Sequence, residues 1–520
     1  MPTLTLDYIL EHCKDGVLLH QNASIDAIDH ITLDSRKTTA TSLLVALCGQ
    51  RVDGRQFIAN SSAPLILVDQ WSDDFEQQAQ QWNKTVIQVS NARRSMAILA
   101  AELEQHPSKS MHMVGITGTN GKTTTTWMLS HILQYCQHSS MSTSKTLDND
   151  QRKVGTIGTI GHRINGVPTA IQDGFTTPES PGLQRVLREF VNQGCHVCIM
   201  EVSSIGLMMH RVGGIKFDVT AFTNFTQDHL DIHGSMNAYL LEKRKLFTEH
   251  VHSNSTSILV VDQDEIAMTP VTEGQSIKVS TQANQTCDLW VSNPKYSLEG
   301  VDFIVHIHSK SHQSTTRQTH PAYVPLIGKH NVENAIVATS VARALGYSTT
   351  DILNALRSLP QAPGRLERIS SPVGWHAFVD YAHTPDALLQ SLSSLKPLCH
   401  GKLWVLFGCG GDRDIRKRPE MGRIAVQESD CVIVTSDNPR SENPQTIVQH
   451  ILNGIPVDCL KPVHSIVDRK EAIAWAIQQL HTEDVLLVAG KGHENYQIIQ
   501  GIKHSFDDRK EIERFISKNH

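Results

Sequence analysis

Residues 115 to 127 read Gly-Ile-Thr-Gly-Thr-Asn-Gly-Lys-Thr-Thr-Thr-Thr-Trp and lie between an apolar strand pattern and a helical pattern. Gly118 and Gly121 allow the backbone to curl so that successive N–H groups point at phosphate oxygens, and the following helix adds the positive end of its dipole. Lys122 is expected to reach the terminal phosphates, and the hydroxyl of Thr123 is expected to bind Mg²⁺. The first glycine lies one position too early for the strict phosphate-loop spacing, but the Gly-Lys-Thr triplet still predicts nucleotide binding.

The composition of the whole chain limits the kinds of partner. With 47 Lys and Arg against 53 Asp and Glu, the formal net charge is −6, so the chain lacks the basic footprint of a nucleic-acid-binding protein. We therefore expect small-molecule partners. No apolar run approaches the roughly 20 residues of a membrane span, and the segment Met1–Gly16 lacks the features of a signal peptide.

The cysteines indicate a reducing compartment. Ten of them are scattered along the chain, which fits reduced thiols better than a disulfide framework. Cys195 and Cys198 spell C-x-x-C, but without a second pair nearby we interpret them as thiols of a buried strand rather than as zinc ligands. We expect a cytoplasmic monomer.

The pattern of strands and helices predicts three α/β domains, because 520 residues are too many for one core. The expected bounds are 1–107, 108–359 and 360–520. Two prolines and a glycine within 359–364 end a helical pattern and mark the last boundary. The first domain has strand-like runs at 42–47 and 64–68.

The central and third domains have different strand patterns. In the central domain the runs 198–200, 219–222 and 258–261 are typical of buried parallel strands, the stretch 284–323 predicts an antiparallel flap, and 137–153 is interpreted as a flexible insertion. In the third domain strands at 403–407, 431–435 and 485–489 alternate with helical segments, which predicts a Rossmann-like, doubly wound parallel sheet with ligands at the carboxyl ends of its strands.

Two acidic motifs follow strands of the central domain. Glu201 ends a buried strand, where a carboxylate can hold Mg²⁺ beside the terminal phosphate. The stretch 228–234, Asp-His-Leu-Asp-Ile-His-Gly, follows the next strand. Taken alone it is equally compatible with a polar turn and with a metal role.

Many ordered motifs resemble those of the Mur ligases, the ATP-dependent amide-bond synthetases of peptidoglycan assembly. The resemblance covers almost the whole chain and rests on the segments 176–178, 201–204, 228–234, 328–335, 363–367, 379–386, 407–414 and 489–494. It implies the three-domain Mur ligase architecture, with a domain for the UDP-linked substrate, a domain for ATP and a domain for the amino acid.

The resemblance implies a specific reaction, that of the third Mur ligase in the assembly of the peptidoglycan precursor. ATP phosphorylates the D-glutamyl side-chain carboxylate of UDP-N-acetylmuramoyl-L-alanyl-D-glutamate, and the amine of an incoming amino acid attacks the acyl phosphate. The products are ADP, phosphate and a nucleotide-linked tripeptide. Domain closure and a charged site suit this chemistry, because water must be excluded and negative charge must be neutralised.

The resemblance also implies the residues that bind ATP and metal. Thr123 and Glu201 would hold one Mg²⁺, and His229 with a lysine carbamylated by CO₂ would hold a second. The carbamylated position falls on Lys243, with Lys245 as the neighbour otherwise suspected; a solvated helix lysine is the alternative without the resemblance. The catalytic set is Lys122, Lys243 and His229, and the ATP contacts are Gly118, Thr119, Asn120, Gly121, Lys122, Thr123, Thr124, Asn331, Arg365, Asp380 and His383.

The nucleotide-linked substrate is expected to contact the first two domains. Ser35, within the segment 34–37, matches the family's uridine-binding segment, although the residues that follow depart from the family pattern. Contacts to the dipeptide arm are implied for Thr176, Thr177, Ser203, Met209 and Arg211. Met209 occupies a position that is Gln in some members and Ile205 one that can be His, so one hydrogen bond to the substrate is expected to be lost or replaced there.

The acceptor amino acid is inferred from Asp437-Asn438-Pro439-Arg440. This motif matches ligases that add meso-2,6-diaminopimelate, whereas relatives that add lysine lack its arginine. Diaminopimelate differs from lysine by one carboxylate, to which a guanidinium offers a bidentate, charge-assisted contact. The pocket is expected to be completed by Arg413, Gly490 and Glu494, with the Glu494 carboxylate facing an ammonium.

Three alternatives remain. One is a Mur-like ligase with a different acceptor or pathway, which Met209 and Ile205 keep open. A second is a folylpolyglutamate synthetase, against which the Asp437–Arg440 motif argues. A third, from another class, is a nucleotide-dependent switch, which would hydrolyse ATP slowly whatever amino acid is present.

Overall fold

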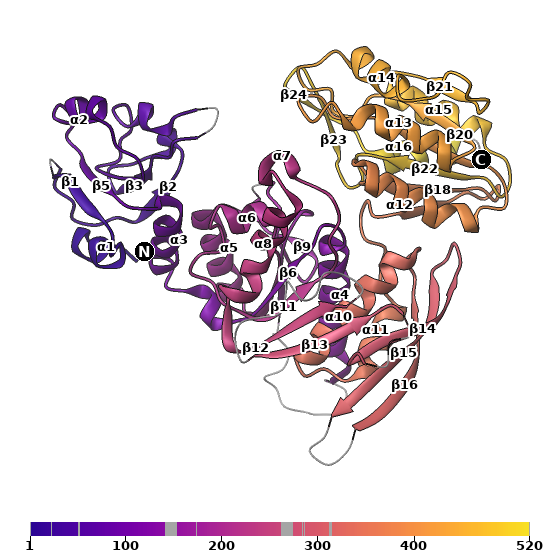
Figure 1. Cartoon of the computed structure of the whole chain (residues 1–520), viewed down its shortest axis with the longest axis horizontal. Helices are drawn as coiled ribbons and strands as arrows, with labels where there is room; N and C mark the ends of the chain where they lie inside the picture. Colours follow the sequence, from indigo (N-terminus) through magenta and orange to yellow (C-terminus); the bar gives the residue numbers. More distant parts are fainter. Residues whose placement is uncertain are drawn as a thin grey trace. The chain divides into compact units, whose positions relative to one another are not determined.

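The computed structural model describes residues 2–21, 23–49, 52–140, 153–172, 174–261, 274–282, 284, 286–310 and 315–518. Most of the predicted insertion at 137–153 lies outside these residues. The chain divides into two compact units, Met1–Lys278 with Ser340–Tyr347, and Val279–Thr339 with Ser348–His520. Figure 1 labels many of the elements of both units.

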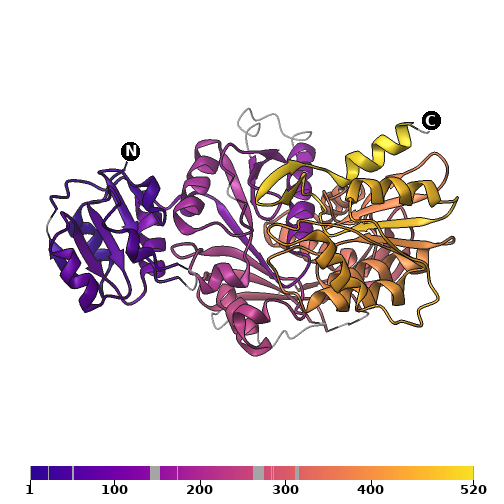
Figure 2. The same cartoon turned by 90° about the horizontal axis from the view of Figure 1, so that it is seen from above.

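The N-terminal part of the first unit is a small α/β sheet layer, as predicted; Figure 2 shows it in indigo. Its strands run in the order β1 (Val17–Gln21), β5 (Thr85–Gln88), β4 (Leu65–Val68), β3 (Ser42–Val45) and β2 (His30–Thr32). All neighbours are parallel except β1 and β5. The helices of this part are α1 (Leu6–His12), α2 (Asp73–Ala79) and α3 (Ala92–Leu103).

A second sheet of the first unit positions the nucleotide loop. Its strands run in the order β12 (Val251–Val260), β11 (Phe217–Phe222), β6 (His112–Thr117), β10 (Cys195–Glu201), β7 (Lys153–Ile157), β8 (Arg163–Ile164) and β9 (Val167–Pro168). The strands β12 to β7 are parallel and buried, which confirms the prediction. The helices are α4 (Lys122–Ser140), α5 (Ser180–Asn192), α6 (Ser204–Met208), α7 (Leu230–His233) and α8 (Met236–Thr248).

The second unit begins with the end of β13 (Gln275–Ser280), which pairs in parallel with β14 (Leu289–Tyr296). The strands β14, β15 (Val301–Lys310) and β16 (Thr315–Val324) are antiparallel, which confirms the predicted antiparallel pairing (Figure 1). Side chains alternate between the two faces of these strands, so the alternation of polar and apolar residues was a reliable signal. The helices α10 (Lys329–Ala344) and α11 (Thr349–Arg357) follow.

The C-terminal sheet has the predicted doubly wound form. Its strand order is β17 (Glu367–Ser370), β18 (His376–Asp380), β22 (Val485–Ala489), β19 (Leu403–Phe407), β20 (Cys431–Val434) and β21 (Val463–Ser465). Only β17 is antiparallel to its neighbour. The remaining elements are α12 (Pro385–Leu395), α13 (Lys417–Glu428), α14 (Pro444–Leu452), α15 (Arg469–Gln479), the hairpin β23 (Tyr496–Ile499) to β24 (Ile502–Ser505) and α16 (Asp508–Lys518).

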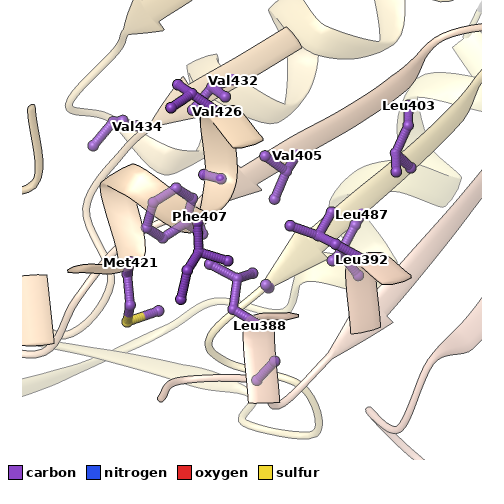
Figure 3. Packing of buried hydrophobic residues seen from close by; sticks show 14 of the residues in the cluster. Leu388, Leu392, Leu403, Val405, Phe407, Met421, Val426, Val432, Val434 and Leu487 are labelled. Carbon is purple, nitrogen blue, oxygen red and sulfur yellow. The ribbon is translucent and has the colours of Figure 1, made fainter. Parts of the chain in front are cut away.

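Two apolar clusters cover the two faces of this sheet. On one face Phe407 and Val405 of β19 pack with Leu388 of α12 and Met421 of α13 (Figure 3). On the other face Leu406 of β19 belongs to a cluster with residues of α15 and α16. Helices on both faces leave the carboxyl ends of the strands as the open edge, which is where ligands bind in such sheets.

Within the described ranges, no helix is long and apolar enough to cross a membrane. All ten cysteines are free thiols, and Cys195 and Cys198 are both buried in β10. Burial raises the pKa of the Cys195 thiol to about 12, so this thiol stays protonated and unreactive at neutral pH.

His250 is expected to make the stability of the first unit depend on pH. Burial lowers the pKa of its imidazole from 6.5 to about 4. Between these values the unfolded chain binds a proton that the folded chain does not, so the free energy of unfolding falls as the pH falls. His250→Gln should reduce this acid-induced loss by about 2 kcal/mol between pH 7 and pH 5. Denaturant unfolding of both proteins at the two pH values measures the difference, and equal losses would contradict it.

Candidate active site

The nucleotide loop connects β6 to α4. Gly118 and Gly121 have φ values of +147° and +84°, backbone conformations that side chains disfavour. A Cβ atom on Gly118 would lie 1.9 Å from Oγ1 of Thr223, so a side chain there would collide with the neighbouring segment. The curled loop at the start of a helix is the geometry of a phosphate cradle.

A segment that sequence reasoning missed holds this loop. The N–H of Thr119 donates to the carbonyl of Asn224 at 2.9 Å, and the N–H of Asn120 donates to the side-chain oxygen of Asn224 at 2.8 Å. Thr223 Oγ1 donates to the carbonyl of Asn120 at 2.6 Å. Their position directly after the predicted strand at 219–222 was the one available signal for these residues.

Lys122 and Lys243 lie close together at this loop. Lys122 Nζ donates to the carbonyls of Gly118 and Thr119 at 2.8 and 2.9 Å. Lys243 Nζ, from α8, also donates to the carbonyl of Gly118 at 2.8 Å. The backbone curl therefore collects two amines near the expected position of the terminal phosphates.

Lys243 is 1% exposed and has an unusual environment for a lysine. Its Nζ lies 4.4 Å from the centroid of the Tyr239 ring. Desolvation, and then the positive charge of Lys122, hold the pKa of Lys243 well below its usual value. By contrast, Lys245 forms a 2.7 Å ion pair with Glu242 on the same helix. Lys243 is therefore the lysine of this helix that most readily loses its proton.

Glu201 lies at the end of β10 and is fully buried. Its Oε2 accepts hydrogen bonds from Thr123 Oγ1 at 2.8 Å and from Thr159 Oγ1 at 3.0 Å, and its Oε1 accepts one from the N–H of Thr159 at 3.0 Å. A Cβ atom on Gly158 would lie 2.1 Å from Oε1, so the glycine makes room for the carboxylate. Thr123 and Glu201, which were predicted to share a metal, thus lie side by side; Thr159 was missed.

His229 lies in the left-handed region at φ +52°, directly before α7. Its Nε2 is 3.4 Å from Oδ2 of Asp228, and burial lowers the pKa of its imidazole, which favours the neutral form that binds metals. Across the described ranges, no group of three or more His, Cys, Asp or Glu side chains could hold a metal ion.

The residues predicted to contact the dipeptide arm surround α6. Thr177 Oγ1 donates to the carbonyl of Glu201 at 3.0 Å and accepts from the N–H of Ser203 at 3.0 Å. Ser203 caps α6 by accepting from the N–H of Gly206. Thr176 Oγ1 lies 3.0 Å from Oγ1 of Thr159. Thr176, Thr177 and Ser203 are thus linked through hydrogen bonds to the surroundings of Glu201.

Arg211 is fixed by a carboxylate that sequence reasoning missed. It donates to the carbonyl of Thr177 at 2.9 Å and to Oε1 of Glu179 at 2.7 Å, and its guanidinium lies 4.9 Å from the Phe175 ring centroid. Glu179 also accepts from Arg93 of α3 at 3.0 Å. One carboxylate therefore orients Arg211 and ties it to the N-terminal part of the unit.

Met209, which departs from the family pattern, lies at the end of the same helix, α6. Ser35 belongs to another element. Met209 is the C-terminal cap of α6, and its N–H donates to the carbonyl of Ile205 at 2.9 Å. Ser35 begins a short 3₁₀ helix (Ser35–Lys37) capped by Asp34, and its carbonyl accepts from Thr38 Oγ1 at 2.7 Å. Its predicted uridine contact stays a prediction.

The remaining predicted ATP residues belong to the second unit. Asn331 is buried near the start of α10 and donates to the carbonyl of Ile327 at 2.7 Å. The Asp380 carboxylate accepts from the N–H groups of Leu366 and Ala382 at 2.7 and 2.9 Å and from Ser391 Oγ at 3.0 Å. Burial raises the pKa of this carboxyl. Asp380 therefore holds the loop that contains Arg365, the residue before Leu366.

Tyr381 lies between two of these residues. The Arg365 guanidinium is 4.9 Å from its ring centroid, and the His383 ring centroid is 4.7 Å from it. Nδ1 of His383 is 2.8 Å from the carbonyl of Tyr381. The stacked guanidinium is a planar, charged surface of the type that suits a phosphate or a ribose hydroxyl.

The predicted acceptor residues meet at the carboxyl ends of β19, β20 and β22. Arg440 follows β20 and donates from Nη1 to the carbonyl of Gly411 at 2.7 Å. It has φ +53°, and β23 holds this backbone, because the Arg440 N–H donates to Ile498 O and the Gln500 N–H donates to Arg440 O. Arg413 lies in the loop after β19 and is exposed.

Gly490, Asp437 and Glu494 complete this group. A Cβ atom on Gly490, at φ +112°, would lie 2.5 Å from Oδ2 of Asp437, so only glycine lets the two loops approach. Asp437 Oδ1 accepts from the N–H of Asn438 at 2.6 Å, and Asn438 Nδ2 donates to Oε2 of Glu494 at 2.8 Å. The structure thus brings together predicted acceptor residues that lie more than 50 positions apart in the chain.

A buried ion pair that sequence reasoning missed connects the loops after β19 and β20. Arg418 of α13 is fully buried and forms a bidentate contact with Glu442, at 2.8 and 2.9 Å. Glu442 Oε1 also accepts from the N–H of Asp412 at 2.6 Å, and Arg418 Nη2 donates to the carbonyl of Gly410 at 3.3 Å. These contacts hold the loop that carries Arg413 and Gly411.

Known proteins share this organisation. Residues 116–342 match the family model of the Mur ligase middle domain, and residues 364–492 match that of the Mur ligase glutamate ligase domain. A relative from Clostridium botulinum, named UDP-N-acetylmuramoyl-L-alanyl-D-glutamate–2,6-diaminopimelate ligase, is 33% identical over an alignment of 520 positions that covers 99% of this chain and 100% of the relative. A Geobacillus kaustophilus protein of the same name is 36% identical over 519 residues, 98% of each chain.

Solved structures give the same result for the fold. A structure of a UDP-N-acetylmuramoyl-L-alanyl-D-glutamate–2,6-diaminopimelate ligase covers 100% of this chain and 99% of its own, with a TM-score of 0.63 and 28% identity. MurF from Thermotoga maritima, solved with ADP, covers 94% of this chain and 98% of its own, with a TM-score of 0.59 at 17% identity. A folylpolyglutamate synthase from Mycobacterium tuberculosis covers 76% of this chain and 92% of its own, with a TM-score of 0.57 at 16% identity. The last two show the fold alone.

Proposed function

This chain belongs to the Mur ligase family, and we propose on that basis that it joins meso-2,6-diaminopimelate to the D-glutamate of UDP-N-acetylmuramoyl-L-alanyl-D-glutamate. It is an ATP-dependent ligase that forms an amide bond in peptidoglycan synthesis. The observation that carries this function is the similarity to ligases of that name over 98 to 99% of the chain. The Asp437–Arg440 motif at the carboxyl end of β20 supports the same acceptor.

The chain's own residues account for the phosphoryl-transfer step. The N–H groups of the nucleotide loop and the Lys122 ammonium would neutralise charge that grows on the γ-phosphoryl group as it moves to the D-glutamyl carboxylate. Lys122 already lies against the loop carbonyls of Gly118 and Thr119. Its ammonium therefore needs only a small side-chain movement to reach a bound phosphate.

The fit of the site to Mg²⁺ rests on its donor atoms. Thr123 Oγ1 and Glu201 Oε2, 2.8 Å apart, are hard oxygens of the kind that Mg²⁺ prefers. We propose that these two residues hold one Mg²⁺ and that His229 with a modified Lys243 holds another. When bound, the metal would draw negative charge from the phosphate oxygens and orient them.

Lys243 is suited to carbamylation. Burial, and then the charge of Lys122, lower the pKa of its amine, which favours the neutral form with the lone pair that attacks CO₂. The nitrogen forms a bond to the CO₂ carbon and releases one proton, which leaves an anionic carbamate. We propose that this carbamate supplies the oxygen donor that the described acidic and imidazole groups lack.

Each of the three predicted domains is assigned a different substrate. We propose that 1–107 binds the uridine part, 108–359 binds ATP and 360–520 binds the amino acid. We also propose that the enzyme works as a monomer in the cytoplasm, where ATP and the UDP-linked substrate are made and where its free thiols stay reduced. Its partners would be these small molecules.

A second candidate is a Mur-like ligase with a different acceptor or pathway. The observation that favours it is Met209, the C-terminal cap of α6, with Ile205 inside that helix, two apolar side chains at positions that are Gln in some family members and can be His. These residues belong to the first unit, with the proposed dipeptide contacts, whereas Arg440 belongs to the second. They therefore bear on the first substrate more than on the amino acid.

Phosphate release from ATP tests the function directly. The assay contains UDP-N-acetylmuramoyl-L-alanyl-D-glutamate with meso-diaminopimelate, with L-lysine or without an amino acid. Release only with diaminopimelate is the expected result. Phosphate release with lysine but not with diaminopimelate would refute the proposed acceptor. Phosphate release that does not depend on any amino acid would favour the second candidate or a nucleotide-dependent switch.

A further inference from the structure

Lys491, the residue after Gly490, is a fully buried lysine beside the proposed amino-acid pocket. Its Nζ is 3.1 Å from Oε2 of Glu494 and 3.3 Å from Oδ1 of Asn438. Burial of an ammonium is costly unless it is paired and hydrogen-bonded. The chain retains this lysine at a point where the loops after β20 and β22 meet.

The three side chains form a closed set of hydrogen bonds. Oε2 of Glu494 accepts from Lys491 Nζ and also from Asn438 Nδ2 at 2.8 Å. Oδ1 of Asn438 accepts from Lys491 Nζ and from the N–H of Ile498 at 2.9 Å. The Asn438 amide thus accepts two hydrogen bonds through its oxygen and donates one through its nitrogen, which fixes its orientation.

This arrangement uses only one oxygen of Glu494. In the part of the chain that the structure describes, Oε1 of Glu494 has no protein partner, while Oε2 has two. The Glu494 side chain is 16% exposed. Oε1 is therefore the oxygen that stays available to a ligand ammonium while Oε2 is held by Lys491 and Asn438.

We propose that Lys491 is a positioning residue for the acceptor pocket, an inference that rests on the proposed function. It turns Glu494 so that Oε1 faces the ammonium of the diamino acid, and it fixes Asn438, two residues before Arg440. It acts through these two side chains and does not itself bind the substrate. The lysine therefore helps to set the distance between the carboxylate and the guanidinium that recognise the two ends of one acceptor.

Lys491→Met is expected to raise the KM for diaminopimelate about 10- to 50-fold, because Glu494 loses a charge-assisted partner in a nearly buried place. The KM for ATP should change less than about twofold, because the contacts of Lys491 lie in the acceptor loops. Lys503→Met is the matched control, since Lys503 is exposed and lies 4.5 Å from the Tyr496 ring centroid. The control should keep both constants.

A double variant distinguishes a positioning role of Lys491 from a role in the stability of the fold. If Lys491 acts partly through Glu494, the variant with both Lys491→Met and Glu494→Gln should lose less kcat/KM than the product of the two single losses. Multiplied losses, or equal rises in the KM values for ATP and diaminopimelate with a lower melting temperature, would overturn the inference. If Lys491→Met does not fold, Lys491→Gln, which keeps a donor, decides by the same measurements.

The parent enzyme separates this inference from the function. If the parent enzyme does not use diaminopimelate as a substrate, the proposed function is refuted, regardless of the results with the variants. If the parent uses diaminopimelate and Lys491→Met matches the parent in KM, the positioning role alone is refuted.

Discussion

Lys243→Ala is expected to lower kcat for diaminopimelate ligation by about 10²- to 10³-fold, because it removes the proposed carbamate, an oxygen ligand of the Mg²⁺ that would neutralise charge on the transferred phosphoryl group. Short carboxylic acids such as acetate are expected to restore part of the activity, since they can place an anionic oxygen in the space that the side chain leaves. Phosphate release at saturating substrates, with and without added acid, measures both effects.

The physical basis of this prediction is the burial of Lys243. A lysine that is 1% exposed and lies next to Lys122 is poorly stabilised as a cation. Conversion to a carbamate replaces two neighbouring positive charges with an opposite pair, which the buried site favours. The lysine is thus better suited to its environment after modification than before it.

Lys245→Ala is the matched control for this variant. Lys245 lies on the same helix, but it forms an ion pair with Glu242 that is partly exposed, so its loss should cost about 1 kcal/mol or less of stability and little activity. Unchanged activity of Lys243→Ala, without any effect of added acid, would contradict the carbamate proposal. A loss that no acid restores would assign Lys243 a structural role instead.

Residues at strand ends could be found from the sequence, because a strand end places its side chain at a known edge. Glu201 and the nucleotide loop were recognised in this way, and their side-by-side position in the structure follows from the parallel order of β6 and β10. The parallel strands and the antiparallel β14 to β16 were predictable from their hydrophobic periods.

Residues that act through a partner far away in the chain could not be found in this way. Thr159 contacts Glu201 across 42 positions and Arg418 contacts Glu442 across 24, and neither lies in a motif. Lys491 stands inside a motif that the sequence singled out, yet its role was not predictable, since burial and hydrogen bonding decide whether a lysine binds a ligand or holds its neighbours. Asp380 likewise contacts backbone N–H groups that no sequence pattern shows.

Arg440→Ala is expected to lower kcat/KM for meso-diaminopimelate by about 10²- to 10³-fold, because the extra carboxylate of the substrate is left without its charged partner. Within the described residues, only Nη1 of Arg440 has a hydrogen-bond acceptor, Gly411 O. The Nε and Nη2 edge is therefore available for the bidentate contact that a carboxylate prefers. Arg440→Lys should be intermediate, since it keeps the charge but not the paired donors.

Two comparisons make the Arg440 prediction specific. Arg423→Ala, an exposed arginine on α13 that contacts only Gln427 among the described side chains, should leave every constant unchanged. Arg440 already adopts φ +53°, so alanine adds no new backbone strain, and the melting temperature should fall little. Phosphate release with diaminopimelate and with L-lysine then shows whether the loss follows the carboxylate. Any release with lysine, which has no such group, should change much less; an equal proportional loss for both amino acids, or a matching rise in the KM for ATP, would refute the assignment of Arg440 to the acceptor carboxylate.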